Sequence, residues 1–412
     1  MRVALLTREY PPEVYGGAGV HVEYLARELA HLVNVDVHCF GGDRPADGAA
    51  PRVFAYRSWD RLAGPAPHLA ALRAMAVDLA IAAGVEGVDV AHSHTWYANF
   101  AGHVAKLMYG VPHVCTVHSL EPMRPWKAEQ LGGGYRLSTF CEQTALEHAD
   151  AVIAVSSAVR DDVVRCYPAV DRTRVHVVHN GIDPIEWHPD NGVEALKRHG
   201  VDPAAPTVIF VGRVTRQKGI QHLLEAAQHL DPSVQIVLRA GSPDTPELGH
   251  ELARQVEALR ARRSNVVWIE AMLERWEVIQ LLTHADVFCC PSIYEPLGLV
   301  NLEAMACETA VVASSVGGIP EVVAHGETGL LVPFAPAGED DPAPADPDAF
   351  AADLATALNT VLDDPALRAS MGRAGRQRVI EHFSWSAIAH RTIDLYRSAG
   401  AAQADTPGSR IT

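Results

Sequence analysis

The feature that most constrains the fold is a series of short, valine-rich apolar runs that alternate with longer stretches of helical periodicity. The first series comprises Val3–Leu6, Val35–Phe40, Val88–Ala91, His113–Val117, Ala151–Val155 and Val175–Val178. These runs are apolar on both faces, as the buried strands of a parallel sheet are. Between them lie segments with helical spacing, such as Val22, Leu25, Ala26 and Leu29. The alternation predicts a doubly wound α/β sheet.

The pattern then restarts, which indicates a second domain. The second series comprises Thr207–Val211, Val234–Leu238, Val266–Ile269, Val287–Cys290, Ala310–Ala313 and Leu330–Val332. The 412 residues also exceed the roughly 250–300 at which single cores stop growing. Residues 183–206 are rich in Pro, Gly, Asp and Asn, and we interpret them as the linker region, with one short helix near Val193–His199.

The C-terminal part contains an insert and a final helix. Residues 335–348 are acidic and Pro-rich, which predicts a mobile surface loop. Residues 383–397 have an apolar side that includes Trp385, Ile388 and Tyr396, which predicts a helix. We therefore expect domains at 1–185 and 186–382, a C-terminal helix at 383–398 and a disordered tail at 399–412.

Charge and cysteine content narrow the class of protein. The formal net charge is −16, which disfavours nucleic acids and anionic membranes as partners. The seven cysteines are scattered, without a Cys-x-x-Cys pair, and are expected to be buried thiols in a reducing compartment. The first apolar run is too short for a signal peptide, and no run reaches the roughly 18 residues of a membrane helix. We therefore expect a cytoplasmic protein.

A glycine-rich loop follows the first predicted strand and opens a helix. Gly16, Gly17 and Gly19 would let backbone amides approach an anion at the helix start. In open α/β sheets this end of the strands is where ligands bind. The spacing differs from the Gly-x-Gly-x-x-Gly of nicotinamide-binding proteins, and a tight turn without a ligand is the alternative.

Histidines end two neighbouring strands of the first series. His118 follows His113–Val117, where it can exchange a hydrogen bond or a proton with a ligand. His92 and His94 end the preceding strand. The alternative is a structural role, and a zinc site from this cluster fits no common metal-binding spacing. We therefore expect no metal.

Two cations lie in the turn after the first strand of the second domain. Arg213 and Lys218 are accompanied by Gly212 and Gly219. In an acidic chain, cations at the carboxyl end of a strand suit a diphosphate. The alternative is a solvated basic turn.

The most specific pattern is a pair of carboxylates eight residues apart. Glu295 lies in a Pro/Gly turn after Val287–Cys290, and Glu303 lies two turns into the helix that follows. This helix starts at Gly298, Leu299 and Val300, whose amides would be free to donate. Carboxylates beside free amides suit the recognition of hydroxyl groups, whereas a helix-surface carboxylate is the alternative for Glu303.

Taken together, these motifs resemble glycosyltransferase family 4, a retaining family with two facing Rossmann-like domains. The resemblance covers nearly the whole chain. Its main signs are the Glu295–Glu303 pair, Arg213 with Lys218-Gly219, Asn180-Gly181-Ile182-Asp183, Gly16-Gly17-Ala18-Gly19, and Phe383-Ser384-Trp385 before a last helix that crosses back onto the first domain. The segments 7–21 and 116–127 look like the actinobacterial glycogen synthase type, whose members use ADP-glucose and extend glycogen or convert glucose-1-phosphate to maltose-1-phosphate.

The resemblance implies roles for the candidate residues, around a central cleft. Arg213 and Lys218 should hold the donor diphosphate, and Glu303 should bind the ribose hydroxyls. Glu295 should meet the donor sugar together with the amides of Gly298, Leu299 and Val300, and His118 should contact its hydroxymethyl group. Gly16, Gly17 and Gly19 should close over the phosphates, and Arg124 and Lys127 should bind an anionic acceptor. No metal or other cofactor is implied.

Several alternatives remain open. A sucrose-phosphate or thiol-precursor glycosyltransferase would use a UDP-sugar. An epimerase would isomerise the donor without an acceptor, and a phosphorylase would need a lysine that carries pyridoxal. A non-catalytic sugar-binding protein is the alternative outside the enzymes. The residues settle neither the base of the donor nor the oligomeric state, for which a homodimer is one alternative.

Overall fold

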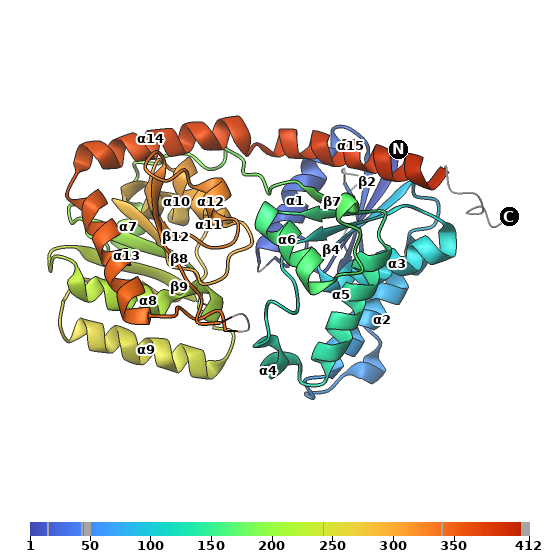
Figure 1. Ribbon diagram of the computed structural model, residues 1–412, viewed down its shortest axis with the longest axis horizontal. Helices are drawn as coiled ribbons and strands as arrows, with labels where there is room; N and C mark the ends of the chain where they lie inside the picture. Colours follow the sequence, from blue (N-terminus) through green and yellow to red (C-terminus); the bar gives the residue numbers. More distant parts are fainter. Residues whose placement is uncertain (15, 43, 45–50, 242, 339–340, 405–412) are drawn as a thin grey trace. The chain divides into compact units, whose positions relative to one another are not determined.

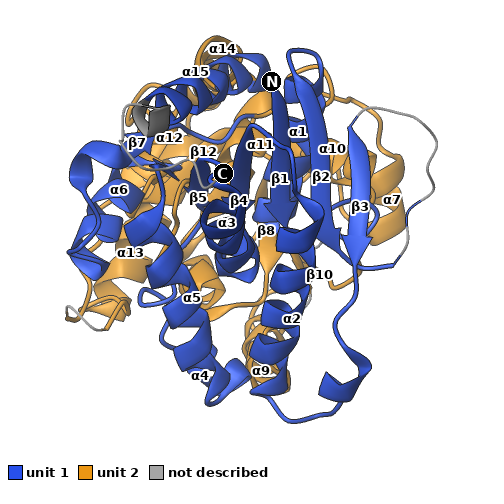
Figure 2. Cartoon of the chain, turned by 90° about the vertical axis from the view of Figure 1, so that its right-hand side faces the viewer, with its two compact units in different colours: residues 1–181, 385–412 blue, residues 182–384 orange. Residues whose placement is uncertain are grey.

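The computed structural model describes residues 1–14, 16–42, 44, 51–241, 243–338 and 341–404 and divides the chain into two compact units (Figures 1 and 2). Unit 1 comprises Met1–Gly181 and Trp385–Thr412, and unit 2 comprises Ile182–Ser384. The predicted boundaries, after residues 185 and 382, differ from these by a few residues. Each unit is an α/β domain with a parallel sheet, which confirms the predicted fold class.

The sheet of unit 1 has seven parallel strands in the order β3-β2-β1-β4-β5-β6-β7. Their bounds are β1 (Arg2–Thr7), β2 (Asn34–Phe40), β3 (Arg52–Tyr56), β4 (Val90–His94), β5 (His113–Val117), β6 (Ala151–Ala154) and β7 (Val175–Val177). All six predicted runs are strands. The sequence analysis missed β3, an edge strand whose apolar run Val53–Tyr56 is only half buried.

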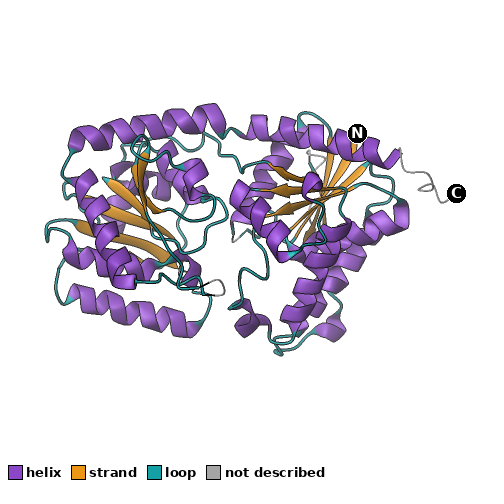
Figure 3. Cartoon of the chain, in the orientation of Figure 1, coloured by secondary structure: helices purple, strands orange, loops and turns teal. Residues whose placement is uncertain are grey.

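Helices cover both faces of this sheet (Figure 3). They are α1 (Gly17–Ala30), η1 (Asp60–Leu62), α2 (Leu69–Gly84), α3 (Trp96–Tyr109), α4 (Lys127–Leu131), α5 (Gly134–His148), α6 (Ser157–Cys166), η2 (Arg172–Arg174) and α15 (Trp385–Ala404). Successive β1 residues point to opposite faces, so Val3 and Leu5 join one core cluster while Ala4 and Leu6 join another. This two-sided burial explains why the strands are continuously apolar.

The last helix, α15, belongs to unit 1 although it is last in sequence. Trp385, Ile388 and Tyr396 lie in the same core cluster as the α1 residues Val22 and Leu25. The helix continues to Ala404, so the predicted disordered tail is wrong for residues 399–404. Residues 405–412 of that predicted tail lie outside the described residues.

The sheet of unit 2 has six parallel strands in the order β10-β9-β8-β11-β12-β13. These are β8 (Thr207–Arg213), β9 (Gln235–Gly241), β10 (Val266–Ile269), β11 (Val287–Cys290), β12 (Ala310–Ser314) and β13 (Gly329–Val332). The helices are α7 (Glu194–His199), η3 (Arg216–Lys218), α8 (Ile220–Ala226), η4 (Ala227–His229), α9 (Pro246–Arg260), α10 (Arg275–His284), α11 (Leu299–Ala306), α12 (Ile319–Val322), α13 (Pro347–Leu362) and α14 (Pro365–His382). The short helix predicted in the linker region is α7.

The acidic insert is more ordered at its ends than the sequence suggested. Pro336 and Pro344 form an isolated antiparallel bridge, and the backbones of Ala337 and Ala343 are hydrogen-bonded. The Asp346 carboxylate accepts from the amide of Ala349 and so caps α13. The predicted mobile loop over 335–348 is therefore wrong for residues 346–348, and residues 339–340 lie outside the described residues.

Two sequence expectations about composition can be compared with the fold. All seven cysteines are free thiols, and each is buried except the half-buried Cys166. Within the described ranges, every helix is too short or too polar to cross a lipid bilayer.

Candidate active site

In unit 2, the turn after β8 carries the two predicted cations. Arg213 ends β8, and Lys218 lies in the single turn η3 that follows. Gly219 has a positive φ of 61°, and a Cβ on it would lie 2.1 Å from the carbonyl oxygen of Pro291. Only glycine fits this close approach, which holds the Lys218 turn against the loop after β11.

That loop places Glu295 against Lys218. The Lys218 Nζ atom donates to Glu295 Oε2 over 2.5 Å, and the two side chains are 17% and 8% exposed. Burial by itself would lower the pKa of Lys218, but the charge and hydrogen bond of Glu295 raise it above its usual value. Lys218 is therefore a charged ammonium at neutral pH, and Glu295 fixes its position.

Arg213 is also held by a carboxylate. Its Nη1 atom donates to Asp244 Oδ1 over 3.0 Å, in a pair that is more exposed than the pair of Lys218. The sequence analysis missed Asp244, because it lies in a loop beyond β9, 31 residues from its partner. Both predicted cations therefore lie at the carboxyl end of β8, each beside one carboxylate.

Helix α11 starts at this edge of the sheet. Its N-cap Gly298 has a φ of 97°, and a Cβ there would lie 2.4 Å from the Asn301 side-chain amide. Leu299 and Val300 are the first helical residues, and the amides of a first turn have no partner within the helix. The positive end of the helix dipole adds to their affinity for electron-rich atoms.

Glu303 is the second carboxylate of the predicted pair and lies on α11. Burial raises the pKa of its carboxyl group to about 7, against the opposing charges of Arg275, Lys218 and Arg239. These cations come from α10, η3 and β9 respectively. Glu303 is therefore a carboxylate that titrates near neutrality, which is common at functional sites.

Arg239 is a cation of this region that the sequence analysis missed. It lies within β9, and its Nη2 atom is 3.1 Å from the Sδ atom of Met272. Burial lowers the pKa of the Arg239 guanidinium, and the charge of Glu303 opposes this. An arginine inside an apolar strand gave no spacing signal, because its neighbour Glu303 is far away in sequence.

In unit 1, the predicted glycine loop forms the start of α1. The amide of Gly16, the N-cap residue, donates to Glu9 Oε2 over 2.9 Å. A Cβ on Gly19 would lie 2.8 Å from the Glu9 side chain, so this turn requires a small residue. Gly17 begins the helix. The three predicted glycines therefore form a tight helix start around a carboxylate.

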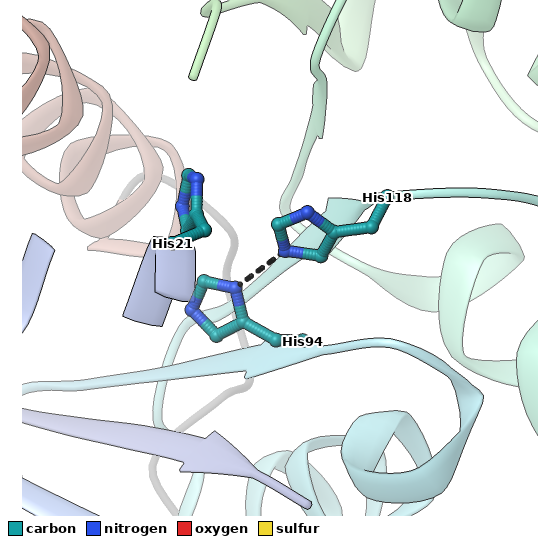
Figure 4. A group of neighbouring side chains, drawn as sticks. All are labelled: His21, His94 and His118. Carbon is teal, nitrogen blue, oxygen red and sulfur yellow. Dashed lines mark hydrogen bonds between the residues drawn. The ribbon is translucent and has the colours of Figure 1, made fainter. Parts of the chain in front are cut away.

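His118 lies beside two other histidines (Figure 4). Its Nε2 atom is 3.1 Å from His94 Nδ1, and its ring centre is 4.6 Å from that of His21 on α1. Burial lowers the pKa of all three imidazoles, to about 4 for His21, so they are neutral at pH 7. The sequence analysis paired His118 with the β4 histidines and missed His21, which lies about a hundred residues away in the chain.

His92 does not join this group through a hydrogen bond. Its Nδ1 atom lies 2.6 Å from the Tyr396 hydroxyl and its Nε2 atom 2.7 Å from the Thr116 hydroxyl. Both ring nitrogens are thus satisfied inside the core. His92 fits the structural alternative, and it links β4 to α15.

The predicted acceptor residues Arg124 and Lys127 have different surroundings. Arg124 Nη2 donates to Glu121 Oε1 over 2.5 Å, and Glu121 is fully buried. The Lys127 ammonium lies 5.7 Å from the centre of the Tyr97 ring, above which the Arg8 guanidinium also lies at 4.1 Å. Lys127 and Arg8 therefore both lie near the Tyr97 ring, whereas Arg124 anchors its own loop.

A second buried carboxylate completes that anchor. Glu142 accepts hydrogen bonds from the amide of Glu121 and the hydroxyl of Tyr167, at 2.8 and 2.7 Å. Burial and the neighbouring charge of Glu121 raise the pKa of Glu142 to about 8. The Tyr135 hydroxyl donates to the Glu121 carbonyl. The segment between His118 and Lys127 is therefore fixed by a hydrogen-bonded network on α5.

Comparison with protein families assigns both halves of the chain. Residues 15–186 match the family described as Glycosyltransferase Family 4, and residues 194–378 match Glycosyl transferases group 1. The chain is 54% identical over 410 residues to the alpha-maltose-1-phosphate synthase of Mycolicibacterium smegmatis, and the aligned region covers 97% of this chain and 100% of that protein. It is 30% identical over 431 residues to the glycogen synthase of Mycobacterium tuberculosis, with coverage of 97% and 95%.

Solved structures give the same fold. A sucrose-phosphate synthase from Thermosynechococcus elongatus matches with a TM-score of 0.77 at 28% identity, over 97% of this chain and 99% of that one. The catalytic domain of starch synthase IV from Arabidopsis thaliana, bound to ADP and acarbose, matches with a TM-score of 0.70 at 17% identity, over 97% and 99%.

Proposed function

This chain belongs to glycosyltransferase family 4 and is a hexosyltransferase, and from that premise we propose its specific reaction. The proposed enzyme retains configuration and transfers glucose from ADP-glucose, with an α-1,4 linkage, to glucose-1-phosphate, to an α-glucan such as glycogen, or to both. The product with glucose-1-phosphate is maltose-1-phosphate. The observation that carries this proposal is the 54% identity to a maltose-1-phosphate synthase over the full length of that relative.

The departing nucleotide diphosphate is the group that needs most stabilisation. Transfer of the glucosyl group breaks the bond from the anomeric carbon to the diphosphate, and negative charge develops on the leaving oxygen. Lys218 and Arg213, fixed by Glu295 and Asp244, supply positive charge at the end of β8. Cations that are positioned before the reaction stabilise this charge without reorganisation.

Glu295 is not a nucleophile in this proposal. Its Oε2 atom accepts hydrogen bonds from Lys218 and from Ser292, at 2.5 and 3.3 Å, so this carboxylate is already paired with an ammonium group. In a retaining glycosidase the second carboxylate attacks the anomeric carbon, whereas Glu295 is proposed here to hold Lys218 in place. Retention is then explained by attack of the acceptor on the same face from which the diphosphate leaves, and Glu295 meets the sugar hydroxyls.

The rest of the donor is assigned to groups of matching chemistry. The ionised form of Glu303 accepts hydrogen bonds from the ribose hydroxyls, and the first amides of α11, at Gly298, Leu299 and Val300, donate to the donor sugar and its phosphate. His118 contacts the glucose hydroxymethyl group as a neutral imidazole. The glycine turn at the start of α1 is proposed to lie over the phosphates.

The acceptor phosphate is assigned to Lys127 together with Arg8. These two cations share the Tyr97 ring, and Lys127 lies at the start of α4, where the helix dipole also favours an anion. Arg124 is reassigned from direct contact to positioning, because the buried Glu121 holds its guanidinium. No metal or organic cofactor is needed for transfer in this proposal, since Lys218 and Arg213 supply the charge.

One alternative donor has specific support. The sucrose-phosphate synthase structure, at 28% identity, supports a transferase of the sucrose-phosphate type, for which we expect a UDP-sugar donor. The higher identity to the alpha-maltose-1-phosphate synthase supports the type for which we expect ADP-glucose.

The test combines two donors with two acceptors. Purified protein is incubated with ADP-glucose or UDP-glucose, together with glucose-1-phosphate or glycogen, and the products are followed by nucleotide release and mass spectrometry. We expect a disaccharide phosphate from ADP-glucose and glucose-1-phosphate. Transfer to glycogen alone would make the enzyme a polymer-extending synthase, and transfer from UDP-glucose alone would refute the proposed donor.

A further inference from the structure

Three histidines of unit 1 meet in one place although they come from separate parts of the sequence. His21 lies on α1, His94 ends β4 and His118 follows β5. Each offers a ring nitrogen that lies within 4.8 Å of the nitrogens of the other two (Figure 4). We propose that His21, His94 and His118 form a binding site for a divalent transition-metal ion, with zinc as the best fit, which is not needed for sugar transfer.

The spacing of the rings fits such an ion. Zinc binds imidazole nitrogens at about 2.0–2.1 Å with tetrahedral angles, so two bound nitrogens lie about 3.4 Å apart and their ring centres about 5 Å apart. The observed distance from His94 Nδ1 to His118 Nε2 is 3.1 Å. The three ring centres are separated by 4.6, 5.3 and 5.4 Å. The separations are therefore close to those of a zinc site, but His94 Nδ1 and His118 Nε2 now face each other, and their rings must turn before both nitrogens point at one ion.

The hydrogen bonds leave nitrogen lone pairs available. His21 Nδ1 lies 2.7 Å from the side-chain oxygen of Asn180, which can only accept, so Nδ1 carries the proton and Nε2 presents a lone pair. That Nε2 atom is buried and has no hydrogen-bond partner among the described residues. This arrangement, a ligating histidine that donates its other N–H to a fixed acceptor, is typical of metal sites.

His94 and His118 can each present a nitrogen lone pair to a metal ion without losing a proton. Their 3.1 Å contact requires that one nitrogen donates and the other accepts. The His94 Nε2 atom is buried without a partner among the described residues, so a proton on Nδ1 can move there and free Nδ1 for the metal. The net charge of −16 also attracts cations.

Three ligands leave the fourth position of a tetrahedral ion open, as in zinc sites that bind water or an exogenous ligand. His118 is only half buried, so the ion has a route from solvent. The sequence analysis expected no metal, because the spacing of His92, His94 and His118 fits no common metal motif, and it could not reveal that α1 adds His21.

The direct test is metal titration of the full-length chain. Protein treated with EDTA and dialysed is titrated with Zn²⁺ by calorimetry, and one equivalent is expected to bind. With Co²⁺, the strong visible absorption of a tetrahedral nitrogen site is expected. No binding by the wild-type chain, or a weak octahedral Co²⁺ spectrum, would overturn the proposal without any variant.

Variants then locate the ion. His94→Ala and His21→Ala should lose the bound equivalent, and Asn180→Ala should weaken binding by about 10–100-fold, the usual effect of removing such a hydrogen-bonding partner. His390→Ala, an exposed histidine on α15, is the matched control and should bind as the wild type does. Circular dichroism checks that each variant is folded. Undiminished binding by folded His94→Ala and His21→Ala would refute the site.

A consequence for activity rests on the proposed function. If His118 contacts the donor sugar, zinc should inhibit transfer reversibly, and EDTA should restore it. Zinc that binds without slowing transfer would leave the metal site in place and would refute the proposed contact of His118. A chain without transferase activity would refute the proposed function, while calorimetry would still decide the metal site.

Discussion

Replacement of Glu303 by glutamine should make the protein more stable and a weaker binder of its donor. Burial raises the pKa of the Glu303 carboxyl group from 4.5 to about 7. Between these two pH values the folded chain binds more protons at this position than the unfolded chain, so stability falls as pH rises. The difference between these two pKa values corresponds to roughly 3 kcal/mol of stability.

Glutamine resembles the protonated form of Glu303 in shape and charge. The stability difference between Glu303→Gln and the wild type should be small at pH 4.5, grow between pH 4.5 and 7, and reach about 3 kcal/mol in favour of the variant above pH 7. Urea denaturation of both proteins at pH 5, 6, 7 and 8.5 measures it. All other groups titrate in both proteins, so the difference isolates this carboxyl group.

Binding of the donor should change in the opposite direction. Only the ionised carboxylate accepts from both ribose hydroxyls, so wild-type affinity for ADP, measured by calorimetry, should fall as pH drops below about 7. The affinity of Glu303→Gln should be lower at pH 8 and nearly independent of pH. A stability difference that stays constant from pH 5 to 8.5 would refute the raised pKa, whereas unchanged ADP affinity would refute only the assignment to ribose.

Three further predictions concern other parts of the chain. Lys218→Ala and Arg213→Ala should each lower turnover by about 10²–10³-fold in an assay of ADP release, because each removes one donor to a developing anion. Arg254→Ala, which changes an exposed cation on α9, is the control and should keep its turnover. Near-normal turnover of Lys218→Ala or Arg213→Ala would refute the diphosphate assignment. Burial and a neighbouring carboxylate raise the pKa of Glu142 to about 8, so the folded chain should lose stability as pH rises toward and through 8. Glu142→Gln should remove this loss of stability, which thermal unfolding from pH 6 to 9 measures. Parallel stability curves for the variant and the wild type would contradict the raised pKa. Trp385→Ala, which truncates a ring only 3% exposed, should lower the free energy of urea unfolding by about 3–5 kcal/mol; a loss below 1 kcal/mol would mean that α15 contributes little to unit 1.

The sequence predicted the fold well because parallel strands buried on both faces leave a strong local signal. Runs such as Val3–Leu6 and Ala310–Ala313 are apolar whichever way each side chain points. The prediction failed at β3 (Arg52–Tyr56), although Val53–Tyr56 are apolar, and this strand is half exposed at the edge of the sheet. It fails again at residues 399–404, where small residues extend α15 without the long apolar side chains on which the helix prediction depended.

The sequence analysis found candidate residues that lie within one local motif. It missed the partners that are far away in the sequence but in contact in the fold. Glycines and cations next to a strand end, such as Gly219 and Lys218, lie within a few residues of each other. Asp244, Arg239 and His21 reach the candidate residues only through the strand order of each sheet, which periodicity does not give. Spacing along the chain cannot reveal such contacts.

Partner carboxylates, of which the sequence predicted only Glu295, change how the cations act. Lys218 with Glu295, Arg213 with Asp244 and Arg124 with Glu121 are all ion pairs. A buried ammonium without such a carboxylate would tend to lose its proton, since desolvation disfavours its charged form.

The partner carboxylate keeps each cation charged and in place. In the proposed reaction, an entering diphosphate then needs only to add its hydrogen bonds to Lys218 and Arg213, with little movement of either cation. These two ion pairs are therefore proposed to act chiefly by preorganisation: they lower the reorganisation needed when negative charge develops on the leaving group. This account also explains why Glu295, the residue most easily mistaken for a nucleophile, is the partner of Lys218, the more buried of the two cations assigned to the diphosphate.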